Sequence, residues 1–369
     1  LSAFITACAG DRMDLNEISD LTKAMITSGK QLNWNKEIVV DKHCIGGLPG
    51  NRTTPIVVAI AAAYGLTMPK TSSRAITSPA GTADTMEVLT NVTLSGEEIK
   101  RVVEQEGGCL AWGGTAQLSP ADDILIKVEK ALDIDSEGQL IASVLSKKAA
   151  AGATHVVIDI PVGETAKVRS KEAAQKLKEH MEAVGDAVGL KIKVVITDGS
   201  QPVGRGIGPN LEAVDVLSVL QNEENAPQDL KERALLLAGE LLELSEKVET
   251  GKGLETAKEL LESGKAYQKF EAICKAQGRF SKTYVAPYQF EMHAPTSGTV
   301  KKINNRKIAK LAKLSGAPQS KLAGISMNVR LGDEIEKGGL LYRLHAESNG
   351  ELNYALEYYE NHDDIIVIE

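Results

Sequence analysis

Apolar residues recur at helical spacing at the start of the chain and again in its middle. Residues 1–34 are predicted to be mostly helical because five apolar residues keep this spacing ahead of Gly29: Leu15, Ile18, Leu21, Met25 and Ile26. Residues 121–150 carry a second helical pattern. Between the two, a β-branched run at 37–40 predicts a short strand, and the apolar run at 55–64 predicts a helix that ends at Gly65.

The next part of the chain alternates between strand and helix patterns. β-branched runs at 154–159 and 191–197 flank a charged helical segment at 170–188. This alternation predicts the α/β class, in which a small helical domain accompanies a large α/β domain with a mixed, largely parallel sheet. Ligands of such sheets bind outside the carboxyl ends of the strands. Glycine-rich segments near 45–50, 71–85 and 197–210 are expected at those ends.

The pattern changes after two long amphipathic helices predicted over 228–276. APTSGTV at 294–300 and GDEIEKGGLLYRLHA at 332–346 are typical of short strands and turns. They resemble the half-motifs of a biotinyl-like barrel without its modified lysine, which argues against a carrier or docking module and for a structural, barrel-sandwich-like α+β part. The predicted domains are helical (1–36 and 121–150), α/β and phosphate-binding (37–120 and 151–276) and C-terminal (277–369). The first helical pattern begins abruptly, so we expect the N-terminal part of the helical domain to be missing.

Composition narrows the class of protein. The chain has 369 residues and a net charge of −8, which argues against a general nucleic-acid binder and leaves room for a local basic pocket. Apolar runs are too short to span a membrane, and the first residues lack the basic start of a signal peptide. The four cysteines are scattered without a C-x-x-C pair, so we expect a reducing cytoplasmic location with neither disulfides nor zinc.

The first candidate site is DKHCIGGLPGNRTT at residues 41–54. Its paired glycines let the backbone approach a ligand, and the following helix offers its positive N-terminal end to an anion. Lys42, Arg52, Thr53 and Thr54 add cationic and hydroxyl donors. Asn51 follows the last glycine where a P-loop needs lysine, and the G-x-G-x-x-G fingerprint is absent. On spacing alone, a phosphate site and a simple tight turn are equally good interpretations.

The second candidate site is TSSRAITSPAGT at residues 71–82, which gathers six hydroxyl side chains around Arg74. One helix cap needs one hydroxyl, so this cluster exceeds the needs of capping and favours an oxyanion or sugar site. The two segments together indicate phosphate handling.

KHxxGG followed by SSRAITSPAGTADTMEV resembles the thymidine and pyrimidine nucleoside phosphorylases. The resemblance continues through residues 142–148 and 197–208, and six residues match the family signature: Ser72, Arg74, Gly81, Thr82, Asp84 and Glu87. Cys44 stands where the bacterial pyrimidine enzymes have serine, the LPGN loop is one residue longer, and their base-binding arginine has no clear counterpart. With these departures the chain is similar to the archaeal AMP phosphorylases, which convert a nucleoside 5′-monophosphate and phosphate into a free base and ribose 1,5-bisphosphate.

The resemblance implies roles for individual residues. The attacking phosphate is expected near Lys42, Thr54, Ser72 and Thr82. The nucleotide is expected at Gly47, Thr82 and the segment Ser73, Arg74, Ala75, Ile76, Thr77 and Ser78. Ser143 and Lys147 match the base-facing positions on one face of a helix, whereas Lys148 is expected at an exposed helix end. The 5′-phosphate is expected at Lys167, with Arg205 as a second candidate.

Phosphorolysis also needs an acid that protonates the leaving base. Asp135 is the candidate proton donor, with an N-cap role as its alternative, and His43 is the rival acid. Cys44 is expected to be a buried filler rather than a nucleophile. No metal and no cofactor are expected, since inorganic phosphate is itself the co-substrate.

The alternatives to AMP phosphorolysis are a plain thymidine or pyrimidine nucleoside phosphorylase and a phosphoribosyltransferase of the anthranilate type. The latter would need a diphosphate and magnesium site, and the sequence offers no acidic pair placed for one. We expect small-molecule substrates, neither nucleic acid nor membrane as partners, and a homodimer or larger homo-oligomer.

Overall fold

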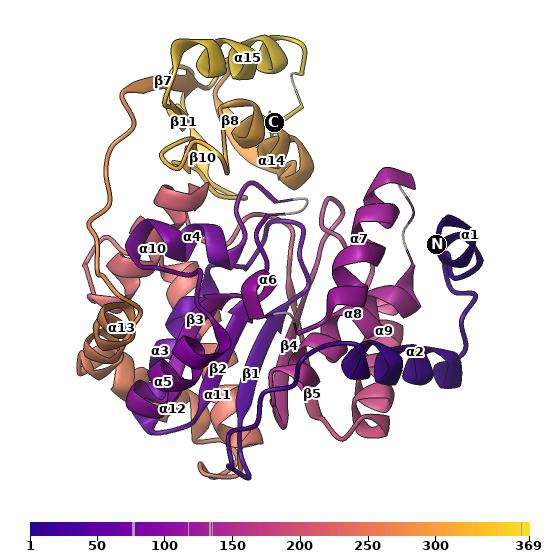
Figure 1. Ribbon diagram of the computed structural model, residues 1–369. Helices are drawn as coiled ribbons and strands as arrows, with labels where there is room; N and C mark the ends of the chain where they lie inside the picture. Colours follow the sequence, from indigo (N-terminus) through magenta and orange to yellow (C-terminus); the bar gives the residue numbers. More distant parts are fainter. Residues whose placement is uncertain (76–77, 117, 133, 135, 363) are drawn as a thin grey trace.

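The protein is described from a computed structural model that covers residues 1–75, 78–116, 118–132, 134, 136–362 and 364–369. A central parallel sheet lies between two groups of helices, and a separate set of strands with two helices lies above it (Figure 1). Within the described residues, none of the helices combines the length and apolar character needed to cross a membrane.

The central sheet is built from two sets of parallel strands. One set has the order β1–β4–β5, with β1 at Val40–Cys44, β4 at His155–Val162 and β5 at Lys191–Asp198. The other pairs β2 at Met68–Ser72 with β3 at Gly108–Trp112. The Val40 amide donates to the Thr67 carbonyl at 2.9 Å and brings β1 beside β2. All five strands run in one direction, so their carboxyl ends meet at one edge.

Seven described helices cover the α/β part; six of them enclose the largest hydrophobic cluster, to which the apolar α3 contributes, and the buried residues of α5 belong to a neighbouring cluster. The seven helices are α3 at Thr53–Tyr64, α4 at Thr82–Leu89, α5 at Gly96–Glu106, α10 at Pro209–Leu220, α11 at Gln228–Leu244, α12 at Gly253–Glu262 and α13 at Lys265–Ala276. The sequence predicted two helices over 228–276, but Gly251 and Gly264, both at positive φ, divide this segment into three.

The helices on the other side of the sheet come from the segments that the sequence predicted as helical. They are α1 at Ser2–Ala7, α2 at Leu15–Thr27, α7 at Pro120–Leu132, α8 at Glu137–Ala150 and α9 at Lys171–Ala187, with the short α6 at Gly113–Ala116 beside the sheet (Figure 1). Asp14 begins α2 with a capping box. Ile18 of α2 and Ile141 of α8 share a hydrophobic cluster with Val156 of β4. The predicted domain boundaries stay predictions.

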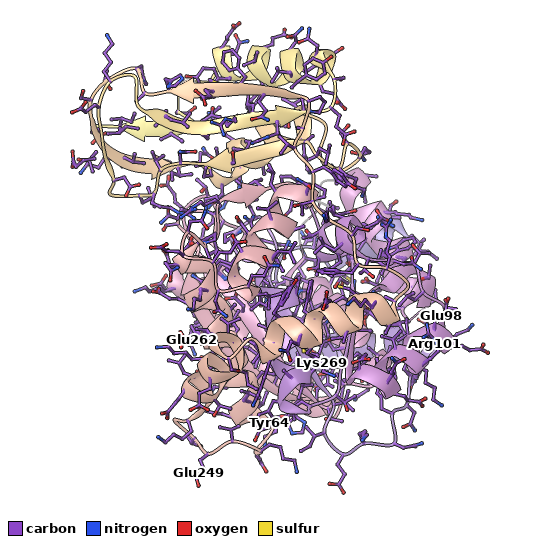
Figure 2. All side chains as sticks on the ribbon, turned by 90° about the vertical axis from the view of Figure 1, so that its left-hand side faces the viewer. Tyr64, Glu98, Arg101, Glu249, Glu262 and Lys269 are labelled. Carbon is purple, nitrogen blue, oxygen red and sulfur yellow. The ribbon has the colours of Figure 1, made fainter. Side chains whose placement is uncertain are left out.

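The C-terminal part consists of antiparallel strands and two helices with their own hydrophobic cluster. Figure 2 shows its strands side by side above the α/β part. The elements are β7 at Tyr288–His293, β8 at Gly298–Ile303, α14 at Asn305–Leu314, β9 at Gly324–Met327, β10 at Glu334–Ile335, β11 at Leu340–Ala346, α15 at Asn349–Glu360 and β12 at Ile366–Ile368. β6 at Gly206–Ile207, from the glycine loop of the α/β part, pairs with β9. The predicted fold class is therefore confirmed.

Candidate active site

A cavity of ≈ 620 Å³ lies at the carboxyl ends of the parallel strands. Its described lining includes seven basic side chains, Lys42, Lys70, Arg74, Lys127, Lys147, Lys148 and Lys167, against the acidic Asp123 and Glu129. The excess of positive charge contrasts with the net charge of −8 for the whole chain. Such a cavity concentrates anionic ligands.

Most of the residues that the sequence singled out meet in this cavity. Those that line it are Lys42, His43, Thr54, Ser72, Ser73, Arg74, Ala75, Ser78, Thr82, Ser143, Lys147 and Lys167. Ile76, Thr77 and Asp135 lie outside the described residues. The segments at 41–54 and 71–82, which are separate in the sequence, therefore form one site with the face of α8.

Lys42 is the most distinctive group of the cavity. It is fully buried, and its Nζ lies 2.7 Å from Thr53 Oγ1 and 3.3 Å from Thr54 Oγ1, at the first turn of α3. Among the described residues no carboxylate comes within ion-pair distance of it. A buried ammonium group beside two hydroxyls and a helix N-terminus is suited to binding an anion.

Asp41 holds two further lysines at the floor of the cavity. Its carboxylate lies 3.0 Å from Lys70 Nζ and 2.8 Å from Lys148 Nζ, and Lys70 also donates to the Lys42 carbonyl at 2.7 Å. Lys148 is buried, so its predicted place at an exposed helix end is wrong. The last turn of α8 is linked to β1 by this ion pair, in which Asp41 compensates the lysine charge. Burial lowers the pKa of Lys148, and Asp41 opposes that effect.

His43, the rival proton donor, lines the same cavity as these lysines. Burial and then the charges of Lys148 and Lys70 lower the pKa of His43 well below its ordinary value of 6.5. The imidazole is therefore neutral near pH 7 in the ligand-free protein. This state is less suited to protonating a leaving base than the imidazolium would be.

Arg74 and Gly81 fix the conformation of the hydroxyl-rich loop at residues 71–82. Arg74 donates to Glu87 at 2.8 and 2.7 Å and to Asp84 at 3.3 Å, and its guanidinium carbon lies 4.8 Å from the ring centre of Trp112. A Cβ at Gly81 would come within 2.5 Å of the Ser73 carbonyl oxygen, so only glycine allows this close approach. The charge of Arg74 is thus already paired, and the residue shapes the loop as it lines the cavity.

Lys321 extends this ion-pair cluster into the C-terminal part. Its Nζ lies 2.8 Å from Glu87 and 3.7 Å from Asp84. Hydrogen bonds from Arg74, followed by those from Lys321, lower the pKa of Glu87 to about 2.

α8 presents Ser143 and Lys147 to the cavity, as the resemblance implied. Lys147 forms an ion pair with Asp122 of α7, whose side chain is almost wholly buried. Gln139 and Ser119 also line the cavity, and the sequence did not single them out. Both side chains are buried and lack hydrogen-bond partners among the described residues, a property that only a structure reveals.

The two candidates for a second phosphate have different surroundings. Gly47, at φ +107, lies against Lys167: a Cβ at Gly47 would be 3.2 Å from the Lys167 Cβ. This contact places Lys167 at the cavity although Gly47 itself is not among the lining residues. Arg205 instead donates to the Asn225 carbonyl at 2.8 Å and is not among the described lining residues, so its role stays a prediction that this geometry does not favour.

Cys44 is buried and unpaired, and its Sγ lies 3.2 Å from Asp159 Oδ2. Burial, and next the charge of Asp159, raise the pKa of the Cys44 thiol. The thiol form prevails, and it is a poor nucleophile. The structure therefore agrees with the prediction of a buried filler.

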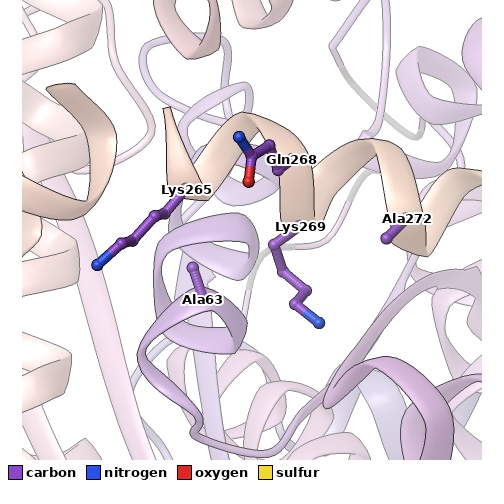
Figure 3. A pocket seen from close by; sticks show the side chains of 5 residues that line it. All are labelled: Ala63, Lys265, Gln268, Lys269 and Ala272. Carbon is purple, nitrogen blue, oxygen red and sulfur yellow. The ribbon is translucent and has the colours of Figure 1, made fainter. Parts of the chain in front are cut away.

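A second hollow lies far from these residues, between α3 and α13 (Figure 3). It has a volume of ≈ 330 Å³ and is lined by Ala63, Lys265, Gln268, Lys269 and Ala272. Lys269 is already paired with Glu106 at 3.0 Å. Within the described part of the chain, no group of three or more His, Cys, Asp or Glu side chains is placed to hold a metal ion.

The fold and the cationic cavity define a class of glycosyl-transferring enzymes. The "Glycosyl transferase family, a/b domain" matches residues 36–267, and the "Pyrimidine nucleoside phosphorylase C-terminal domain" matches residues 299–365. The chain belongs to the thymidine/pyrimidine nucleoside phosphorylase family, as the resemblance predicted, and is an enzyme of the pentosyltransferase type.

Two similar relatives are bacterial proteins named "Putative thymidine phosphorylase". The protein of Legionella pneumophila (strain Corby) is 58% identical over 368 residues, which cover 100% of this chain and 71% of that protein. The protein of Chelativorans sp. (strain BNC1) is 60% identical over 369 residues, which cover 100% of this chain and 72% of that protein. These names support the family and its pyrimidine branch more than the archaeal AMP phosphorylases.

Solved structures with a similar fold include two anthranilate phosphoribosyltransferases. The enzyme from Thermus thermophilus has a TM-score of 0.59 and 22% identity, over 72% of this chain and 86% of that one. The enzyme from Saccharomyces cerevisiae has a TM-score of 0.57 and 15% identity, over 72% of this chain and 80% of that one. At this identity the likeness shows the fold alone.

Proposed function

We propose that the chain catalyses the phosphorolysis of pyrimidine nucleosides, with thymidine as the leading substrate. The observation that carries this proposal is the buried Lys42 ammonium group, which faces the cavity beside Thr53 and Thr54 at the start of α3. A dianionic phosphate would supply the negative charge that the described surroundings of Lys42 lack. The names of the bacterial relatives favour a pyrimidine nucleoside.

The proposed reaction is a displacement at the anomeric carbon of the sugar. A phosphate oxygen held near Lys42, Thr54, Ser72 and Thr82 forms a bond to the anomeric carbon. The bond from that carbon to the base nitrogen breaks, and its electron pair moves to the base, which takes up a proton. The products are a free base and a pentose 1-phosphate. Orienting the phosphate and the sugar is the main contribution of the cavity, since proximity can supply up to about 7–11 kcal/mol.

We propose Asp135 as the acid that protonates the base, because the pKa of the rival His43 is lowered. Asp135→Asn should reduce kcat and leave the phosphate KM near that of the wild type. An Asp135→Asn enzyme with full kcat would contradict this role.

The test of the function is phosphate-dependent release of free base. The purified protein is incubated with thymidine, uridine, adenosine and AMP, with and without phosphate, and the base is quantified by chromatography. Release from thymidine or uridine that requires phosphate is the expected result. The absence of phosphate-dependent base release from both thymidine and uridine would refute the proposal.

A second candidate substrate class, nucleoside 5′-monophosphates with AMP first and CMP and UMP next, is favoured by one observation. Lys167 lines the same cavity and is held there by the turn at Gly47. A nucleotide brings a second phosphate, which needs a cationic group apart from Lys42. Lys167→Gln should then raise the KM for AMP and leave that for thymidine unchanged. Equal effects on both substrates would remove this candidate.

We also propose that the protein is cytoplasmic and assembles as a homodimer or larger homo-oligomer. All four cysteines are free and buried, which suits a reducing compartment. Size-exclusion chromatography with light scattering tests the assembly, and a monomer at all concentrations would contradict it.

A further inference from the structure

Gln139 has a buried side-chain amide that finds no hydrogen-bond partner among the residues that the structure describes. It lies near the start of α8, is 1% exposed and lines the cavity. Within the described part of the chain, neither its Oε1 nor its Nε2 has a hydrogen-bond partner. Leaving both ends of a buried amide unpaired is costly, so such groups are rare in folded proteins.

Helix capping does not account for this side chain. The Gln139 backbone amide donates to Ser136 Oγ at 3.3 Å, which satisfies the start of α8 without the side chain. Gln277 shows what a structural glutamine does in the same protein. It is 2% exposed, accepts from the Leu110 amide at 2.7 Å, and donates to the Asn91 and Leu110 carbonyls at 2.7 and 3.2 Å. The side chain of Gln139 makes no such bond to any described residue.

The position of Gln139 on α8 places it on the base side of the cavity. Gln139, Ser143 and Lys147 are four residues apart and so occupy one face of the helix. The other end of α8 lies near the proposed phosphate site at Lys42, because Lys148 pairs with Asp41 of β1. From Lys148 back to Gln139 the helix rises about 13 Å, which phosphate, sugar and base together can fill.

Ser119 adds a second unpaired donor to the cavity. It is 5% exposed, and its Oγ has no partner within the described residues. It lies at the start of α7, close to Asp122, which pairs with Lys147 of α8. Buried, unsatisfied polar groups therefore occur on both helices that line this side of the cavity.

We propose that Gln139 binds the edge of the leaving base and selects bases that present a hydrogen-bond donor next to an acceptor. The carboxamide offers one donor and one acceptor in a plane, so it can pair with the imide edge of thymine or uracil or with the amino edge of adenine or cytosine. Gln139 is thus a specificity-determining residue of the proposed phosphorolysis, on which this inference rests.

Gln139→Met tests the inference because methionine keeps the volume and removes both polar atoms. The wild type and the variant are compared on two substrate pairs: thymidine with N3-methylthymidine, and AMP with the purine riboside 5′-monophosphate that lacks the amino group. The wild type should prefer the unmodified substrate, and in the variant this preference should shrink by about 5- to 100-fold, the range that a bidentate contact to a base supports. The substrate pair whose preference changes in the variant identifies the edge of the base that Gln139 contacts.

Gln277→Met is the matched control. It should lower Tm, because it leaves the Leu110 amide and two carbonyls unpaired, and it should leave the substrate preference unchanged. Gln139→Met should keep or raise Tm, because it removes unpaired buried atoms from the ligand-free protein. A purely structural Gln139 would give the opposite result, with a lower Tm and an unchanged preference, and would overturn the inference.

The inference and the proposed function fail in different ways. If the wild type turns over a substrate and Gln139→Met keeps its preference, the inference is wrong and the function stands. If the wild type turns over none of them, the proposed function is wrong. Calorimetric titration of thymine and adenine in the presence of phosphate then decides the inference: weaker binding of either base to Gln139→Met supports it, and equal or absent binding to both proteins overturns it.

Discussion

Replacing Lys42 by methionine separates the phosphate role of this lysine from any role in stability. The ammonium group is fully buried with only Thr53 and Thr54 as polar neighbours in the described structure. One pair of unit charges about 4 Å apart is worth about 4 kcal/mol at an effective dielectric constant of 20. Loss of about 3–4 kcal/mol corresponds to a rise of about 100- to 1,000-fold in the phosphate KM.

The assay measures initial rates with thymidine over a range of phosphate concentrations, together with unfolding in urea. The free energy of unfolding should stay near the wild-type value or rise, because the substitution removes a buried charge that no carboxylate of the described residues compensates. Lys100→Met is the control, since Lys100 is exposed and lies 3.9 Å from Glu104 on α5. An unchanged phosphate KM in Lys42→Met would refute the placement of the phosphate, and a large loss of stability would show that Lys42 is structural.

Three further predictions concern the residues that hold the site together. Asp41→Asn leaves Lys70 and Lys148 buried without their carboxylate, so urea unfolding should show a loss of about 3–5 kcal/mol; wild-type stability would contradict this. Gly81→Ala forces a Cβ against the Ser73 carbonyl, and a cost of about 1–3 kcal/mol with reduced activity is expected; an unaffected enzyme would argue against the tight loop. Glu87 has a pKa of about 2, below its ordinary 4.5, so it adds stability above pH 4.5 that is lost as the pH falls toward 2. Glu87→Gln should therefore destabilise the protein by at most about 3 kcal/mol at pH 7, and the difference from the wild type should vanish near pH 2.

The sequence predicted the fold well where an element is a continuous apolar or β-branched run. The apolar α3 and the β-branched β4 and β5 lie close to their predicted positions. The sequence predicted the first strand at 37–40, whereas β1 spans Val40–Cys44 and has the sequence VDKHC. Three consecutive polar residues do not look like a buried strand. They are tolerated there because Asp41 is paired with Lys70 and Lys148, which come from β2 and α8.

The candidate site was predictable where the chemistry lies in contiguous motifs. The two glycine and hydroxyl segments indicated the phosphate side of the cavity, because residue type and local spacing carry that signal. Lys148 and Gln139 carried no such signal, because lysine and glutamine on a helix are ordinarily solvated. Only the three-dimensional structure identifies them: Lys148 pairs with Asp41 across two elements, and the side chain of Gln139 has no hydrogen-bond partner among the described residues.

The ion pairs of Lys321 have a consequence for how this enzyme can change over evolution. Lys321 reaches from the C-terminal part to Glu87, and Glu87 also holds Arg74 of the hydroxyl loop. The C-terminal part is therefore not an interchangeable appendage. A chimera that received this part from a distant homologue would keep its catalytic loop in place only if a cation were retained at position 321 or Glu87 changed with it, so the two positions are expected to co-vary.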